Sequence, residues 1–378
     1  MSAREYPGAA VGTVLIGAGA GYAAGVVGPP VRAISSEFDV SLTAIGLLTS
    51  VFFAGIVIVS FGAPFVVRFL GIRSTVRLAP VLMGLGGVLS AVAPAFWVLL
   101  LGRVVTGLGV GLALVLGGIV GRAVGGGTLI GVYGGAITVA VAVALALGGL
   151  LADAGVSWRA NFVISTVIGF SALPCFAGRL PDTPAVASRP GRALVRSFVT
   201  WRYWRVALLF VLCAGLPLLV SAWIVHYLTA DDAMSASAAG ALGFVLFAVS
   251  TVARPAGGKV DGRHHQLLLL ASPFLAAAGF VLLAVDNRPA LAVPAIIAMG
   301  IGFSIPYAVS YIRSEDLVPG RPTVGLSAEL LAVNVTPVVG SPAVGAAFEH
   351  GQAGLSWLVF AAFSVLAGVV NLPRPPAR

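Results

Sequence analysis

Apolar runs of about 20 residues follow one another along nearly the whole chain, and this feature constrains the fold most strongly. A bilayer core about 30 Å thick needs roughly 20 apolar residues when they form a helix. Only 9% of the 378 residues are charged, whereas an ordinary soluble domain carries about 25%. Too few charges remain to cover a water-soluble surface, so the sequence predicts an all-α integral membrane protein.

Twelve such runs can be drawn between boundaries marked by charge, proline or glycine. Their approximate limits are 8–30, 42–67, 76–94, 97–120, 127–151, 159–178, 204–228, 236–254, 266–285, 290–312, 323–347 and 353–372. The first run is too long for the apolar part of a cleaved signal peptide, so it is expected to be retained as the first span.

The basic residues give an independent test of this count, because Lys and Arg concentrate on cytoplasmic loops. With twelve spans and a cytoplasmic N-terminus, only Arg32, Arg159 and Arg288 of the 22 basic residues fall on the outer side. Arg103 alone falls within a span. The distribution predicts a multi-pass protein of the cell membrane, inner or plasma, with both termini cytoplasmic. It also accounts for most of the net charge of +9, so no nucleic-acid partner is expected.

The longest polar stretch divides the twelve spans into six and six, which predicts two pseudo-symmetric halves. The expected organisation is an N-terminal six-helix half (1–178), a cytoplasmic linker (179–203) and a C-terminal six-helix half (204–378).

Enzymatic and cofactor chemistry is not expected. Cys175 and Cys213 lie in apolar stretches without a CxxC partner or a histidine cluster, so no metal site is predicted. Walker and dinucleotide fingerprints are missing, as are paired catalytic groups within the spans.

Two motifs resemble the major facilitator superfamily of secondary transporters. The family's loop between spans two and three reads G-x-x-x-D-R-x-G-R-R; Gly257 and Asp261 match it in the second half, and Gly71 and Arg73 in the first, where Arg68 replaces the Asp. In the family this loop gates the cytoplasmic side. Span four carries R-x-x-x-G-x-G, from Arg103 to Gly109. The resemblance covers essentially the whole chain and implies two six-helix halves that rock about a central site.

Subfamily signals are less specific. Span five ends in Gly148-Gly149 like the family's antiporter motif, but Ala144 and Leu145 replace its Gly-Pro pair, which argues against a drug/proton antiporter. Arg254, before Pro255, resembles a position in nitrate and nitrite porters where an arginine helps to hold the anion. The segment 63–76 is similar in style to cyanate-type porters. A simple charge of the inner loop is the other interpretation of Arg254.

Two ionisable residues within spans are candidates for the solute site or for coupling. An arginine in hydrocarbon costs roughly 2.5–3.5 kcal/mol, so Arg103 either faces a polar cavity or extends its side chain to the interface. There it could bind an anion or control a carboxylate. Glu329 lies two turns inside span eleven, where it either carries a proton or pairs with Arg313 or Arg321 at the cytoplasmic end.

Three uncharged or weakly basic residues complete the candidates. Asn334 shares a helical face with Ser327 and Ser341, which either lines a polar path or serves helix packing. Tyr22 and His226 either face a solute or anchor the membrane interface.

The sequence therefore predicts a monomeric secondary transporter in the lipid bilayer. It would move a small solute, anionic or neutral, by alternating access coupled to a proton or solute gradient. A transporter-like membrane sensor and a drug/proton antiporter are the alternatives.

Overall fold

The computed structural model describes residues 5–178, 180, 198–259, 263–315, 317–318 and 322–372. Almost all of them are helical. The helices of the first half are α1 (Pro7–Gly25), α2 (Val31–Phe38), α3 (Leu42–Ala91), α4 (Phe96–Asp153) and α5 (Arg159–Ser171), followed by a 3-10 turn, Pro174–Phe176. Those of the second half are α7 (Trp201–Phe210), α8 (Leu216–Leu228), α9 (Ala236–Lys259), α10 (Arg263–Val285), α11 (Pro289–Glu315), α12 (Pro322–Glu349) and α13 (Ala353–Val370).

Two of these helices each contain a pair of spans. The chain turns at Gly71 in α3 and at Gly126 in α4, with φ of 74° and 60°. Only glycine adopts such angles readily. Counting each half of α3 and α4, and adding α10, whose apolar part is Leu269–Val285, the described residues form the twelve predicted spans.

Two features differ from the predicted boundaries. The first span ends at Gly25, because the segment Gly28-Pro29-Pro30 cannot continue a helix, and a short helix, α2, follows outside it. The seventh span is interrupted by a π-helical turn, Val211–Gly215. Pro217 lacks the N–H that would bond the Cys213 carbonyl, which explains why the ladder opens there.

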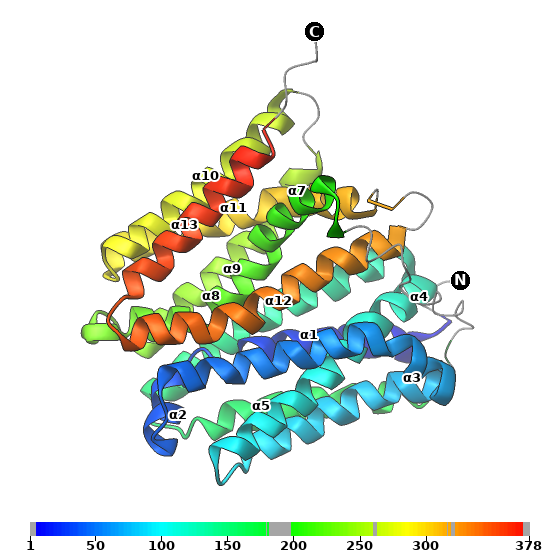
Figure 1. Ribbon diagram of the computed structural model, residues 1–378. Helices are drawn as coiled ribbons and strands as arrows, with labels where there is room; N and C mark the ends of the chain where they lie inside the picture. Colours follow the sequence, from blue (N-terminus) through cyan, green and yellow to red (C-terminus); the bar gives the residue numbers. More distant parts are fainter. Residues whose placement is uncertain are drawn as a thin grey trace.

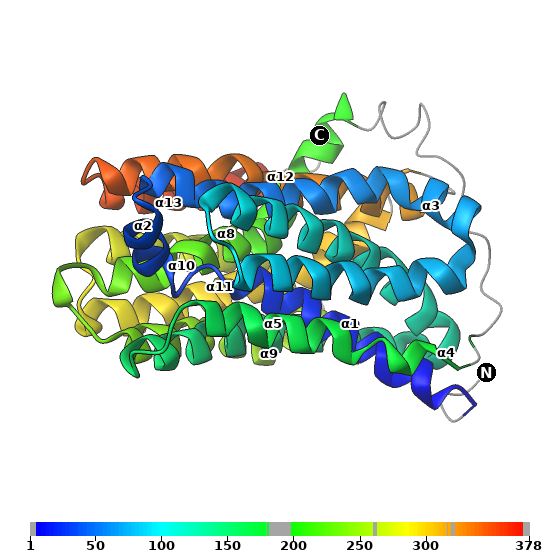
Figure 2. The same cartoon turned by 90° about the horizontal axis from the view of Figure 1, so that it is seen from below.

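The helices form an elongated bundle (Figure 1). Helices α1, α2, α3 and α5 lie together in the lower part of this view, and α7, α10, α11 and α13 in the upper part. The two halves of the chain meet where α3 of the first half packs on α12 of the second, and where α4 of the first half packs on α9 of the second. Figure 2 shows α2 at one end of the bundle and the start of α1 at the other. The end that carries α2 is called the outer end below, after the side that the charges predict for it.

The bundle surface is apolar where it would contact lipid. Ile58, Val167, Val252 and Val339 are each more than 60% exposed. Large exposed apolar areas are avoided by soluble proteins, so the chain is a multi-pass membrane protein.

Candidate solute and coupling site

Arg103 is fully buried in α4, and its side chain binds backbone. Nη1 donates to the Ala23 carbonyl at 2.8 Å, Nε donates to the Leu48 carbonyl at 3.2 Å, and the guanidinium carbon lies 4.1 Å from the centroid of the Phe52 ring. Ala23 is in the last turn of α1, where carbonyls lack intrahelical partners and attract a cation. Arg103 thus joins α1, α3 and α4.

Tyr22 and Asn161 complete the cap at the same helix end. The Tyr22 hydroxyl donates to Asn161 Oδ1 at 2.5 Å, and Asn161 Nδ2 donates to the Val26 carbonyl at 3.1 Å. Tyr22 and Asn161 are 1% and 2% exposed. The two predicted residues Arg103 and Tyr22 therefore come together, with Asn161, which sequence reasoning missed because one asparagine has no spacing signal.

Arg254 lies where the two halves meet. Its Nη1 donates to the Thr138 hydroxyl of α4 at 3.1 Å, and its guanidinium carbon lies 4.2 Å from the centroid of the Tyr307 ring in α11. Among the described residues its buried Nε has no hydrogen-bond partner. Arg254 therefore links the halves and keeps a donor available.

Glu329 is completely buried in α12. In the part of the chain that the structure describes, neither of its carboxylate oxygens accepts a hydrogen bond. It does not pair with Arg313, which is exposed, while Arg321 lies outside the described residues. The preceding residue, Ala328, accepts a hydrogen bond through its carbonyl from the Tyr203 hydroxyl of α7 at 3.1 Å.

Cys213 lies between these groups. It packs with Val333 of α12, one turn from Glu329, and with Tyr307 of α11, whose ring the Arg254 guanidinium contacts. Its thiol donates to the Phe210 carbonyl at 3.6 Å. The Ser310 oxygen is buried and meets no hydrogen-bond geometry with the described residues. Buried polar groups are nearly always paired, so this cluster of Arg254, Glu329, Cys213 and Ser310 has spare capacity to bind a solute or a proton. Sequence reasoning missed Cys213, Ser310 and Thr138, which look like ordinary packing residues in their spans.

Of the predicted gating residues, Arg254 belongs to this cluster; Asn334 and the remaining gating residues make other contacts or lie outside the described residues. Asn334 Nδ2 donates to Leu330 in its own helix at 2.7 Å, whereas Ser341 accepts a hydrogen bond from Trp223 Nε1 at 3.0 Å. Arg68 and Arg73 are exposed on either side of Gly71. Gly257 is in α9, and Asp261 lies outside the described residues.

Arg77, which was not among the predicted gating residues, makes a contact at this end of the bundle. It donates to the carbonyls of Phe176 and Ala177 at 2.9 and 3.1 Å, which ties the third span to the end of the sixth.

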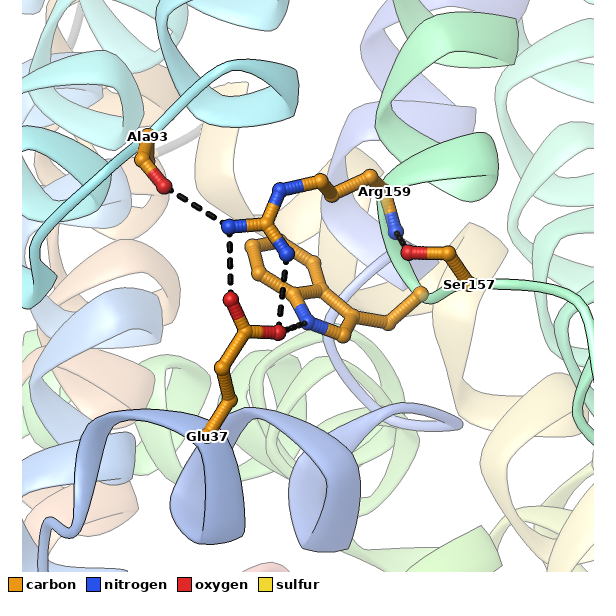
Figure 3. Close-up of polar contacts among 5 residues, drawn as sticks. Glu37, Ala93, Ser157 and Arg159 are labelled. Atoms are coloured by element: carbon orange, nitrogen blue, oxygen red, sulfur yellow. Dashed lines mark hydrogen bonds and ion pairs between the residues drawn. The ribbon is translucent and has the colours of Figure 1, made fainter.

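The outer end holds a cavity of about 660 Å³ between α2, the end of α4 and the start of α9. Beside it Glu37 of α2 forms an ion pair with Arg159 at 2.7 Å and accepts a hydrogen bond from Trp158 Nε1 at 2.5 Å; Arg159 also donates to the Ala93 carbonyl (Figure 3). These bonds, from Arg159 first, hold the pKa of the Glu37 carboxyl below its usual value. They fasten three outer loops of the first half to one another.

The fold defines a polytopic helical membrane protein. The sequence matches the Major Facilitator Superfamily over residues 11–328, so the chain belongs to this superfamily. No curated protein sequence matches it significantly.

Three solved structures are similar in fold. A nucleoside transporter, NupG, has a TM-score of 0.74 at 14% identity, with 96% of this chain and 97% of that one covered. A D-xylose–proton symporter has a TM-score of 0.76 at 16% identity, with 96% of each chain covered. A bacterial homolog of the human lysosomal transporter Spinster, in an inward-facing, unoccupied conformation, has a TM-score of 0.71 at 17% identity, with 98% of each covered. Identities this low establish the shared fold alone.

Proposed function

We propose that the protein is a secondary active transporter that moves a small solute, anionic or neutral, across the cell membrane by alternating access. A proton or solute gradient supplies the free energy. In this proposal residues 1–178 and 204–378 rock as two halves joined by 179–203, the protein acts as a monomer, and both termini are cytoplasmic, as the basic loops indicate.

The observation that carries this proposal is the buried cluster at the junction of the halves. A guanidinium with an unpaired Nε and a carboxylate with two unpaired oxygens are costly in a bilayer. That cost is explained if the cluster binds something that is transported. Arg254 then contacts the solute, which gives the preference for an anion, and Glu329 carries the coupling proton.

The contacts between the halves support a state closed at the outer end. Gly149 of α4 approaches the Ala236 carbonyl of α9, and a Cβ atom on Gly46 of α3 would stand only 2.6 Å from Cα of Pro342 in α12. Near the turn of α4 at Gly126, toward the other end of the bundle, Gly131 and Gly134 have no described atom within 4 Å of the place where a side chain would stand. Tight packing at one end and space at the other is expected of one state in an alternating-access cycle.

Arg103 has a different role in this proposal. Its Nη1 and Nε donate to the Ala23 and Leu48 carbonyls, so in this proposal it mainly fixes the helices around the site. The anion preference therefore rests on Arg254.

A thermal-shift screen of the purified protein tests the proposal. The panel contains nitrate, nitrite, small carboxylates, nucleosides, sugars and quaternary ammonium ions, applied to the wild type, to Arg254→Ala and to the control Arg313→Ala. A ligand at about 100 Kd that binds only the native state stabilises it by about 2.7 kcal/mol. We expect an anion to stabilise the wild type and the control, but not Arg254→Ala.

Two outcomes of the screen would contradict the proposal. Equal stabilisation of all three proteins by one solute would remove Arg254 from the site. Stabilisation without uptake of that solute into proteoliposomes would favour a sensor.

A further inference from the structure

Two carboxylates stand at the wrong ends of their own helices. Asp153 is the last residue of α4 and Glu349 the last residue of α12. The C-terminus of a helix carries the negative end of its dipole and repels anions. Their own helices therefore do not explain these two positions.

Each carboxylate instead binds the first turn of a helix from the other half. Asp153 accepts hydrogen bonds from the backbone N–H groups of Ala236 and Ser237 in α9, at 3.0 and 2.8 Å. Glu349 accepts from the Thr43 hydroxyl of α3 at 2.9 Å and from its N–H at 3.4 Å. At a helix N-terminus a negative charge meets free N–H donors and the positive end of the dipole.

The two contacts repeat the same pattern in sequence. The two helices whose N-termini meet a carboxylate start with Ser41-Leu-Thr-Ala-Ile-Gly46 and Ser235-Ala-Ser-Ala-Ala-Gly240. The two helices that carry the carboxylates end with Gly149-Leu-Leu-Ala-Asp153 and Gly345-Ala-Ala-Phe-Glu349. At each of the two N-termini the leading serine accepts a hydrogen bond from the N–H three residues on, at 3.1 and 3.2 Å. The Thr43 hydroxyl also donates to Glu349, and the Ser237 hydroxyl lies 3.0 Å from the hydroxyl of the leading serine, Ser235.

The glycines of the pattern explain why the helices can come so close. The Cβ position of Gly240 is 2.5 Å from the Leu145 carbonyl oxygen, that of Gly46 is 2.6 Å from the Ser341 carbonyl oxygen, and that of Gly345 directly abuts the Leu42 carbonyl. A side chain at any of these positions would push the helices apart. The glycines therefore allow the close approach of the helices that brings each carboxylate to its helix N-terminus.

The pairs are related as the two halves are. Counting spans, the fifth caps the eighth and the eleventh caps the second, and a shift of six spans converts one contact into the other. We propose that Asp153 and Glu349 form a duplicated outer latch, defined by the Asp153–α9 and Glu349–Thr43 contacts, which holds the halves together at the outer end and must break when that end opens. This proposal builds on alternating access as proposed above.

Thiol labelling from outside the cell tests the latch. Ser221 is fully buried in α8, with its carbonyl against Gly28, in the turn between α1 and α2, at the junction of the halves, so Ser221→Cys reports opening of that junction. A membrane-impermeant maleimide is added to intact cells, and the parent chain without the reporter gives the blank.

We expect Asp153→Asn and Glu349→Gln each to raise the labelling rate of this cysteine about fivefold. This ratio corresponds to ~1 kcal/mol, the typical cost of losing one helix cap. The double variant should show roughly the product, because the two contacts are separate. Asp286→Asn is the control, since Asp286 accepts only from Arg288 N–H within its own loop among the described residues; it should not change the rate.

A second pair of variants keeps the test decisive if a carboxylate variant does not fold. Thr43→Val and Ser237→Ala remove only hydroxyl contacts and should accelerate labelling in the same direction. Unchanged labelling in the double carboxylate variant, or a response to only one of the two sites, would overturn the duplicated latch. Labelling needs no solute, so a responsive latch in a protein that transports nothing would refute the proposed function alone.

Discussion

The two halves differ in what their buried polar groups do. In the first half, Arg103, Tyr22 and Asn161 are bonded to helix carbonyls or to one another. In the described part of the chain, every buried side-chain nitrogen or oxygen without a partner belongs to the second half, namely in Arg205, His226, Arg254, Ser310, Glu329 and Trp357. The first half uses its polar groups to hold its helices, whereas the second retains groups able to bind.

The helix interruptions differ in the same way. The long helices of the first half turn at glycines, Gly71 and Gly126. Prolines occur within helices of both halves, at Pro64 and Pro80 in α3 and within α10, α11 and α12. Among the described residues, the π turn Val211–Gly215 lies in the second half. A π turn loosens the backbone hydrogen bonds inside a span, here in the half that holds the unpaired side chains. In the function that we propose, the first half therefore serves as the scaffold and the second half contacts the solute.

Arg103→Met gives the largest expected effect. The substitution leaves the Ala23 carbonyl without its partner, removes the hydrogen bond to the Leu48 carbonyl and removes the contact with Phe52, so we expect a loss of about 3 kcal/mol in the free energy of unfolding. Unfolding in detergent micelles by heat or denaturant measures it, and Arg68→Met, on an exposed arginine, is the matched control with a change below about 0.5 kcal/mol. A change as small as that of the control would mean that the first half is not held by Arg103.

Glu329→Gln should change the free energy of unfolding little and coupled transport strongly. Glu329 has no partner to lose among the described residues, so unfolding should change by no more than about 1 kcal/mol, with stabilisation as the expected sign because a buried carboxyl is replaced by an amide. Uphill accumulation in proteoliposomes should be abolished while solute exchange continues, since exchange needs no net proton movement.

The control for this variant is Glu315→Gln, which changes a glutamate at the end of the neighbouring helix α11. Accumulation that survives in Glu329→Gln would show that the unpaired groups of the second half do not couple transport to protons.

The number of spans could be predicted because hydropathy is a local property. Each run of about 20 apolar residues must form a helix in the bilayer wherever its neighbours lie. The family motif from Arg103 to Gly109 falls in the fourth of these runs, as it does in the family. Helix α2 was missed because eight residues are too few to show a periodicity. The segments 68–75 and 121–126 were expected to be loops between spans. In the structure the chain instead turns at one glycine in each, Gly71 and Gly126, because a single positive φ suffices to reverse it.

The site could be predicted only as residue types. The sequence indicates that Arg103 and Glu329 are buried, but a backbone carbonyl such as that of Ala23 has no sequence signal as a partner. The contact of Arg254 with Thr138 joins residues 116 positions apart, and only the packing of α4 on α9 brings them together. The solute and coupling roles of Arg103, Glu329, Asn334 and Tyr22 remain predictions, as do the gating roles of the loop residues.

The smallest expected effect concerns the outer loops of the first half. The ion pair of Glu37 with Arg159 is partly exposed, so it contributes at most about 1 kcal/mol at neutral pH. The pKa of Glu37 is lower in the folded protein than in the unfolded chain. The contribution is therefore complete above the unfolded pKa and is lost as the pH falls through the folded pKa. The difference in melting temperature between the wild type and Glu37→Gln should be visible at pH 7 and vanish in acid below that folded value. If the difference instead grew on acidification, Glu37 would stabilise the protein in its protonated form. The first half would then contain an acid that acts when protonated, as we propose for Glu329 in the second half.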